Sequence, residues 1–138
     1  EAESKGDWII VEGQGSIDHP AYSSVTLGLI HGSTPEAMVM VHKPGMAEHD
    51  FDHLPEAHFP IAKLPDFIKL HEAVARLIAP SRVVAIALNT SLIDDEAEAR
   101  RVIAETARET GLPAADPVRF GADELWAAIH AALEPVPA

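Results

Sequence analysis

The sequence contains no cysteine, and it is poor in aromatic and basic residues. Among its 138 residues, 5% are aromatic, and 10 lysines and arginines stand against 22 acids. Without cysteine the chain has no disulfide, no thiolate nucleophile and no thiolate-bound metal, which is typical of proteins in a reducing compartment. We therefore expect a cytoplasmic protein.

Two further absences limit its partners. No apolar run approaches the roughly 20 residues that a membrane-spanning helix needs, and residues 1–7 are polar where a secretory signal would be apolar. The formal charge of −12 offers no cluster of cations for a nucleic-acid backbone or an anionic membrane. We expect the ligand to be a small molecule, with neither nucleic acid nor membrane as a partner.

The hydrophobic share of 47% is enough for one layered domain with a buried core. Short apolar runs rich in β-branched residues predict buried strands, and apolar residues at helical spacing predict amphipathic helices. Strands are predicted at residues 8–11, 36–42 and 82–89, a short edge strand at 117–120, and helices at 20–31, 65–79, 94–110 and 123–133. Strands alternating with helices predict an α/β fold with a mostly parallel sheet flanked by helices.

Residues 1–7 resemble the last turn of a helix that stops at Gly6. We therefore expect the chain to begin inside a domain. The strand at 8–11 would then pair with residues outside this sequence.

The most informative stretch is residues 7–16, DWIIVEGQGS. Glu12 directly follows the predicted buried strand and precedes a turn made of Gly13, Gln14, Gly15 and Ser16. Open α/β sheets bind ligands at the carboxyl ends of their strands. Glu12 is predicted either to act as a base or to hold Mg²⁺, or only to cap the loop that follows. The two glycines let backbone N–H groups approach an anion, although G-Q-G is no established phosphate-binding motif.

Parallel strands would bring His42 and Asn89 to the same sheet edge as Glu12. Lys43 leaves this edge in a turn and can contact a carboxylate or phosphate, or be an ordinary surface lysine. Asn89 and Thr90 can hydrogen-bond to a base or an amide, or instead form an Asx-type turn.

The segment at residues 16–22, SIDHPAY, brings Ser16, His19 and Tyr22 to the start of a helix. His19 can serve as a general acid or base, or it can cap the helix together with Asp18. A serine hydrolase is not indicated, because the sequence has no G-x-S-x-G.

The acidic loop at residues 46–60 carries His49, His53 and His58 among four acids. Imidazole and carboxylate groups suit zinc, manganese or iron. Their spacings match no fixed ligand pattern, so a solvated loop is the favoured interpretation.

Taken together, these segments resemble a known family. Residues 7–45, 82–91 and 111–125 are similar to the carboxyl-terminal P-loop-like domain of the DUF1611 family, and V-E-G-x-G more distantly resembles dethiobiotin synthetase. The resemblance implies a P-loop-NTPase-like domain of which residues 1–138 are the carboxyl-terminal part. Its amino-terminal strands and phosphate loop, and a Rossmann-like domain, would lie outside this chain. The loop at 46–60 departs from the family pattern, which bears on substrate identity.

Some members of that family are D-glutamate N-acetyltransferases that use acetyl-CoA. The resemblance therefore implies an enzyme that transfers acetyl from acetyl-CoA to a small acidic amino acid. The positions that match the family motif are Glu12, Gly13, Gln14, Gly15, Ser16, His19, Pro20, Tyr22, His42 and Asn89. From the chemistry of the side chains and of the glycine turn, we expect catalytic roles for Glu12 and His19, and substrate or cofactor binding by Gly13, Gln14, Gly15, Ser16, Tyr22, His42, Lys43, Asn89 and Thr90. We also expect contact with the amino-terminal half of the same protein, and a homo-oligomer.

Two other functions stay open. One is an ATP- and magnesium-dependent ligase or kinase of the dethiobiotin synthetase type, with Glu12 on the metal and Asn89 near the base. The other is a non-enzymatic ligand-binding module.

Overall fold

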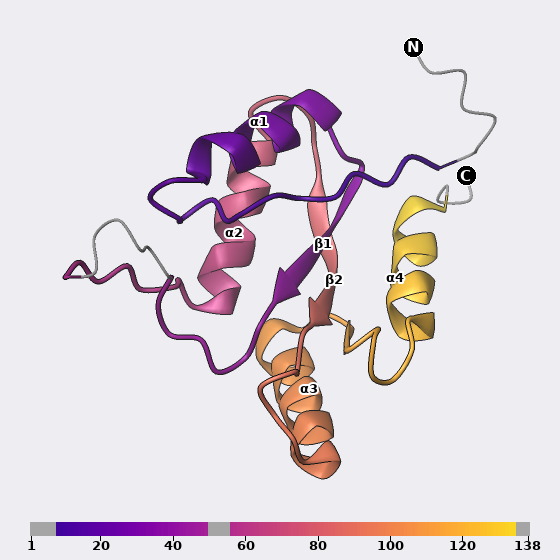
Figure 1. The fold of residues 1–138 in the computed structure, drawn as a ribbon. Coiled ribbons are helices and arrows are strands. Elements are labelled where there is room, and N and C mark those ends of the chain that lie inside the picture. Colours follow the sequence, from indigo (N-terminus) through magenta and orange to yellow (C-terminus); the bar gives the residue numbers. More distant parts are fainter. Residues whose placement is uncertain (1–7, 50–55, 135–138) are drawn as a thin grey trace.

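The computed structural model of the protein describes residues 8–49 and 56–134, in which helices and strands alternate (Figure 1). The elements in chain order are α1 (Ser23–Ser33), β1 (Ala37–His42), α2 (Leu64–Ala75), β2 (Arg82–Leu88), α3 (Glu96–Thr110), β3 (Ala114–Ala115) and α4 (Asp123–Leu133). The described helices include none with the length and apolar character of a membrane span.

The three strands form one parallel sheet in the order β1-β2-β3. The register pairs Ala37 with Arg82 and His42 with Leu88, with one irregularity between Met38 and Val39. The predicted α/β fold with a parallel sheet is confirmed. β3 is only two residues long and pairs with Ile86 and Ala87 of β2.

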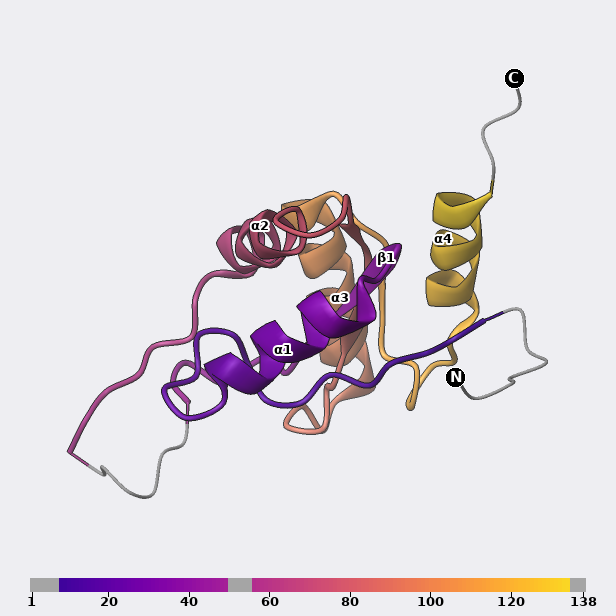
Figure 2. The ribbon, with the colours of Figure 1, turned by 90° about the horizontal axis from the view of Figure 1, so that it is seen from above.

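Helices cover both faces of the sheet. α1, α2 and α3 lie on one side of it and α4 lies on the other (Figures 1 and 2). The larger core joins Ile86 and Leu88 of β2 to Phe67 of α2, and the smaller core joins Val84 of β2 to Leu125 of α4. β2 is therefore buried from both sides, which explains its continuous apolar sequence.

The strand predicted at residues 8–11 is wrong. These residues have no strand assignment and pair with no described strand. Ile9 and Ile10 are 81% and 85% exposed. A strand is stabilised by its ladder and by side-chain packing on both faces, so an apolar run without a neighbouring strand stays extended but unpaired. The segment packs at its beginning instead, where the Trp8 ring lies 5.3 Å from that of Trp126 in α4.

The edge strand predicted at residues 117–120 is also wrong. These residues form a turn, because the backbone N–H groups of Val118 and Arg119 donate to the side chain of Asp116 rather than to a strand. The third strand lies earlier, at Ala114–Ala115.

Helix ends differ from the predictions by a few residues. α1 begins at Ser23 after a turn and ends with Thr34 in the left-handed conformation, without a side-chain cap from Asp18. α2 ends at Ala75 rather than residue 79. α3 is capped by Asp95, one residue after the predicted Asp94, and its carboxylate accepts from the Glu98 N–H at 2.7 Å. The helix at 123–133 has the predicted bounds.

Candidate functional site

The carboxyl ends of β1 and β2 meet as predicted. The Asn89 N–H donates to the His42 carbonyl at 2.9 Å. Successive residues of a strand point to opposite faces. Accordingly, Val41 lines a larger hollow and His42 lines a smaller one. The polar residues at this edge therefore divide between two hollows.

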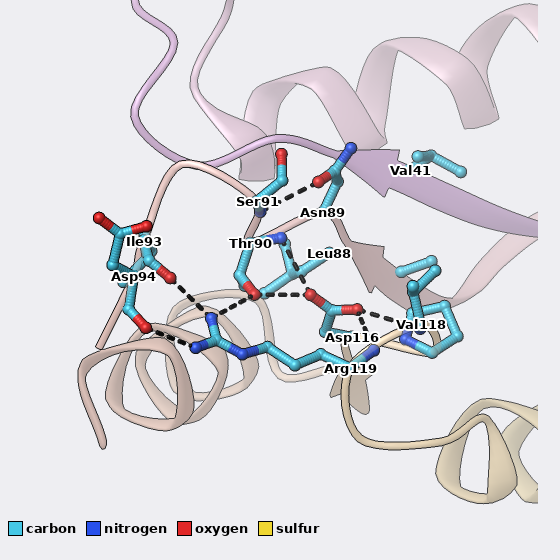
Figure 3. Close-up of a pocket in the computed structure, with 12 residues that line it drawn as sticks. Val41, Leu88, Asn89, Thr90, Ser91, Ile93, Asp94, Asp116, Val118 and Arg119 are labelled. Carbon is cyan, nitrogen blue, oxygen red and sulfur yellow. Dashed lines mark hydrogen bonds between the residues drawn. The ribbon is translucent and has the colours of Figure 1, made fainter. Parts of the chain in front are cut away.

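The larger hollow has a volume of about 690 Å³ and lies at the carboxyl end of β2 (Figure 3). Apolar side chains form much of its wall, and polar groups come from the loops after β2 and β3. Its lining includes Val41, Ala87, Leu88, Asn89, Ser91, Asp116, Pro117, Val118 and Arg119.

Asp116 anchors the wall of this hollow. Its Oδ2 accepts from the Thr90 hydroxyl at 2.6 Å and from the Thr90 N–H at 3.0 Å, and its Oδ1 accepts from the N–H groups of Val118 and Arg119. The residue is 4% exposed. Burial raises the pKa of Asp116, but these hydrogen bonds outweigh burial and leave the pKa below its usual value. Asp116 is therefore ionised, and its role is structural.

Arg119, in the loop after β3, also forms hydrogen bonds to the loop after β2. Its guanidinium donates to the carbonyls of Ile93 at 2.6 Å and Asp94 at 2.8 Å (Figure 3). Asp116 and Arg119 are not singled out by the sequence, because it predicts the last strand of the sheet at residues 117–120 instead of Ala114–Ala115. An acid directly after Ala114–Ala115 has the same position relative to its strand as Asn89 has to β2.

Asn89 and Thr90 differ in what they can offer a ligand. The Asn89 Oδ1 accepts from the Ser91 N–H at 3.1 Å, which is the Asx-type turn of the alternative interpretation. Asn89 lines the larger hollow, and its side-chain NH₂ has no partner among the described residues. Thr90 is buried, and its hydroxyl donates to Asp116.

The smaller hollow, of about 370 Å³, lies on the opposite face and is lined by His42, Lys63, Thr106 and Glu109 among others. Burial lowers the pKa of His42, and the charge of Glu109 opposes this shift only in part. Lys43 lines neither of the two hollows.

The predicted binding turn at Gly13–Ser16 lies against the start of α1. The Thr26 hydroxyl of α1 donates to the Gln14 carbonyl at 2.9 Å. Gly15 has φ of +69°, and a Cβ there would lie 2.5 Å from the Cβ of Tyr22. None of the backbone N–H groups of residues 13–16 donates to another described residue. The turn is therefore held in place without using these N–H groups in hydrogen bonds to the described residues.

Asp18 joins this turn to the acidic loop at 46–60. Its Oδ1 accepts from the Ser16 hydroxyl at 2.5 Å and from His49 Nε2 at 2.8 Å, and its Oδ2 accepts from the Ala62 N–H at 3.1 Å. Burial raises the pKa of Asp18, but the bonds from Ser16, Ala62 and His49 outweigh burial and lower it. The loop is not structureless, since Glu48 and Pro60 form an antiparallel bridge.

His19 is buried beside Asp18. Its Nδ1 accepts from the Ala21 N–H at 3.1 Å, and its ring lies 4.6 Å from Tyr22 and 5.1 Å from His49. The predicted set thus separates into a turn group (Gln14, Gly15, Ser16, His19 and Tyr22) and a sheet-edge group (His42, Asn89 and Thr90).

Glu12 lies in the unpaired segment and is exposed. Its predicted place at the sheet edge beside His42 and Asn89 depended on a strand at 8–11, so that argument fails with the strand. Of the loop histidines, His58 forms an exposed pair with Glu48, and His53 lies outside the described residues. Within residues 8–49 and 56–134, no group of three or more His, Asp or Glu side chains is placed to hold a metal.

Comparison with known proteins agrees with this architecture. The family model described as "Domain of unknown function (DUF1611_C) P-loop domain" matches residues 1–126. The chain belongs to the DUF1611 family. A crystal structure of a DUF1611 family protein from Anabaena variabilis superposes with a TM-score of 0.77 at 45% identity, covering 87% of this chain and 34% of that one.

Two curated relatives are named D-glutamate N-acetyltransferase. The protein from Pseudoalteromonas sp. is 37% identical over 87% of this chain, and the protein from Tritonibacter scottomollicae is 34% identical over 90% of it. The chain spans 35% and 36% of their lengths, about a third of each.

Substitution of Gly15 by alanine should destabilise the protein. Alanine would have to adopt the left-handed conformation and place its Cβ against Tyr22, so we expect a loss of at least about 2 kcal/mol in the free energy of unfolding. Urea denaturation measures it. Gly13→Ala is the matched control, since a Cβ there meets nothing within 4 Å; equal losses in the two variants would contradict the argument.

Replacing Asp116 by asparagine should cost about 2–4 kcal/mol, because an amide cannot accept from all four donors. The lowered pKa of Asp116 means that the unfolded state binds the proton more readily. Its contribution is present above about pH 4 and is lost as pH falls through the folded pKa. Unfolding free energies measured from pH 7 to pH 3 should therefore fall less steeply in Asp116→Asn. The exposed Asp94→Asn variant should behave as wild type.

Proposed function

We propose that the protein carrying this chain is an N-acetyltransferase that transfers the acetyl group of acetyl-CoA to D-glutamate or a similar acidic amino acid. The observation that carries the proposal is the similarity to two proteins named D-glutamate N-acetyltransferase, over nearly the whole of this chain. Because those proteins are about three times longer than this chain, we expect other parts of the protein to complete the site.

We assign the larger hollow to the adenine ring of coenzyme A. Its apolar walls suit a flat ring, and the NH₂ group of Asn89, which has no partner among the described residues, would donate to an acceptor on the ring edge. Arg119 lines this hollow, but its guanidinium is bonded to the carbonyls of Ile93 and Asp94. The phosphates of the coenzyme would then need cations from the rest of the protein.

The turn at Gly13–Ser16 supports the acyl-transfer chemistry. Attack of an amine on a thioester places negative charge on the carbonyl oxygen, and preorganised N–H groups stabilise that charge. The N–H groups of this turn donate to no described residue, and the turn is held in position by Thr26 and by Tyr22 against Gly15. Glu12 and His19 remain the groups predicted from the sequence to act as a base.

The whole protein should release free CoA thiol when it is incubated with acetyl-CoA and D-glutamate. A thiol-reactive dye follows the release, and mass spectrometry identifies N-acetyl-D-glutamate as the product. D-Alanine, which lacks the second carboxylate, is the control substrate and should react much more slowly. Absence of thiol release with every acidic amino acid would refute the proposed function.

The Asn89→Asp variant tests the assignment of the larger hollow. Aspartate keeps the oxygen that accepts from Ser91 but has no NH₂ donor. Loss of about 1.4 kcal/mol of binding corresponds to a tenfold increase in the KM for acetyl-CoA. The KM for D-glutamate should not change in steady-state assays. An unchanged KM for acetyl-CoA would place the adenine elsewhere.

The description of the family domain as a P-loop domain keeps an ATP- and magnesium-dependent ligase or kinase as a second candidate. In that case Glu12 would help to hold Mg²⁺. Magnesium-dependent ATP turnover that is lost in Glu12→Gln, with no transfer from acetyl-CoA, would favour this candidate.

A further inference from the structure

Two histidine–carboxylate pairs occur in the described part of the acidic loop, and they differ sharply in exposure. The side chains of His58 and Glu48 are 79% and 51% exposed, as expected of a solvated pair. Those of His49 and Asp18 are 11% and 17% exposed. The second pair is held in the protein, and it joins segments 31 residues apart.

The environment of Asp18 determines which nitrogen of His49 carries a proton. Asp18 accepts from Ser16 and Ala62 as well as from His49, and these bonds keep the carboxylate ionised. An ionised carboxylate has no proton to donate, so His49 Nε2 must be the donor at 2.8 Å. The lone pair of a neutral His49 therefore lies on Nδ1, which has no hydrogen bond to any described residue.

His19 is arranged differently. Its Nδ1 already accepts from the Ala21 N–H, so the lone pair of the neutral ring is occupied within the turn. Its ring packs against Tyr22 on one side and, edge-on, against His49. These contacts make His19 a packing partner of His49.

The Asp18–His49 pair is connected to two features that acyl transfer could use, the turn at Gly13–Ser16 and the smaller hollow. Through Ser16, Asp18 is bonded to the turn whose N–H groups donate to no described residue. Through Ala62, it is bonded to the wall of the smaller hollow. This hollow of about 370 Å³ has the size of a small-ligand site. Lys63 lines it and offers a positive charge to a carboxylate of the substrate.

We propose that His49 is the base that takes the proton from the amine of the amino-acid substrate, and that Asp18 is its positioning residue. The inference rests on the proposed acetyltransferase function. The substrate ammonium gives one proton to Nδ1 of His49, and the neutral nitrogen attacks the carbonyl carbon of the thioester. The carbon–sulfur bond breaks, and the thiolate takes the second proton from the attacking nitrogen. His49 then releases its proton to water, so that N-acetyl amino acid, CoA thiol and one proton are the products.

The His49→Gln variant separates proton transfer from structure. The glutamine NH₂ can still donate to Asp18, but its side chain cannot accept a proton at neutral pH. We expect kcat for acetyl transfer to fall at least about 100-fold, the usual contribution of a general base, while the KM for D-glutamate stays within about threefold. The thermal unfolding midpoint should match that of wild type.

The pH profile provides a readout that a purely structural role would not change. In the described residues, the titratable groups bonded to or packed against His49 are Asp18 and His19. In wild type, kcat/KM for the amine should rise with pH and then level off, because a general base must be unprotonated to accept the substrate's proton. In His49→Gln it should continue to rise with hydroxide concentration, because the substrate must then lose its proton to solvent.

His58→Gln is the matched control, because it changes an exposed histidine of the same loop, and its kinetics should be those of wild type. If His19→Gln shows the altered pH profile while His49→Gln does not, His19 is the base and the proposal is overturned. Should His49→Gln not fold, nitrogen-15 spectra of the wild-type protein decide: the Nε2–H tautomer of His49 is expected, and the Nδ1–H tautomer would overturn the proposal. An inactive wild type would refute the function itself, whereas an active wild type with unchanged His49→Gln kinetics refutes only this assignment.

Discussion

Burial of β2 from both faces is the constraint on which the rest of this structure depends. A strand covered by α2 on one side and α4 on the other admits only apolar side chains along its length, so polar groups can occur only at its ends. At the carboxyl end they gather within a few residues, and loops from remote parts of the chain must be held there. The sheet supplies the position of a site but none of its polar contacts.

Carboxylates supply those contacts, so some of the many acidic residues of the chain have a structural role inside the protein. Asp116 and Asp18 each accept three or more hydrogen bonds, from neighbouring residues and from a segment far away in the sequence, and both oxygens of each carboxylate have a donor. A carboxylate can accept several hydrogen bonds at once, which makes it an economical connector between loops. The two aspartates thus hold the larger hollow and the turn before α1 in shape, and they leave ligand contacts to neutral groups such as the Asn89 amide.

Much of the fold was predictable because its signals are local. The apolar run at 82–89 and the helical spacing at 123–133 indicate their elements directly, and parallel pairing then brings His42 and Asn89 together. The errors arose where a segment depends on a distant partner. Residues 8–11 have the composition of a buried strand but pair with no strand in the part of the chain that the structure describes, and the turn at 117–120 is created by the side chain of Asp116. His49 could not be singled out either, because its significance lies in a bond to Asp18 that no spacing in the sequence encodes.

The packing of Trp8 has a consequence for observing the protein in solution. Its ring contacts Trp126 and His130 on α4, while six residues later the Gln14 carbonyl accepts from Thr26 on α1. Six extended residues span at most about 20 Å, so this short tether couples the position of α4 to the turn at Gly13–Ser16. The chain has two tryptophans, and both lie in this one contact. The intrinsic tryptophan fluorescence of the protein therefore reports on this contact and on the segment that begins at it, and no added label is needed.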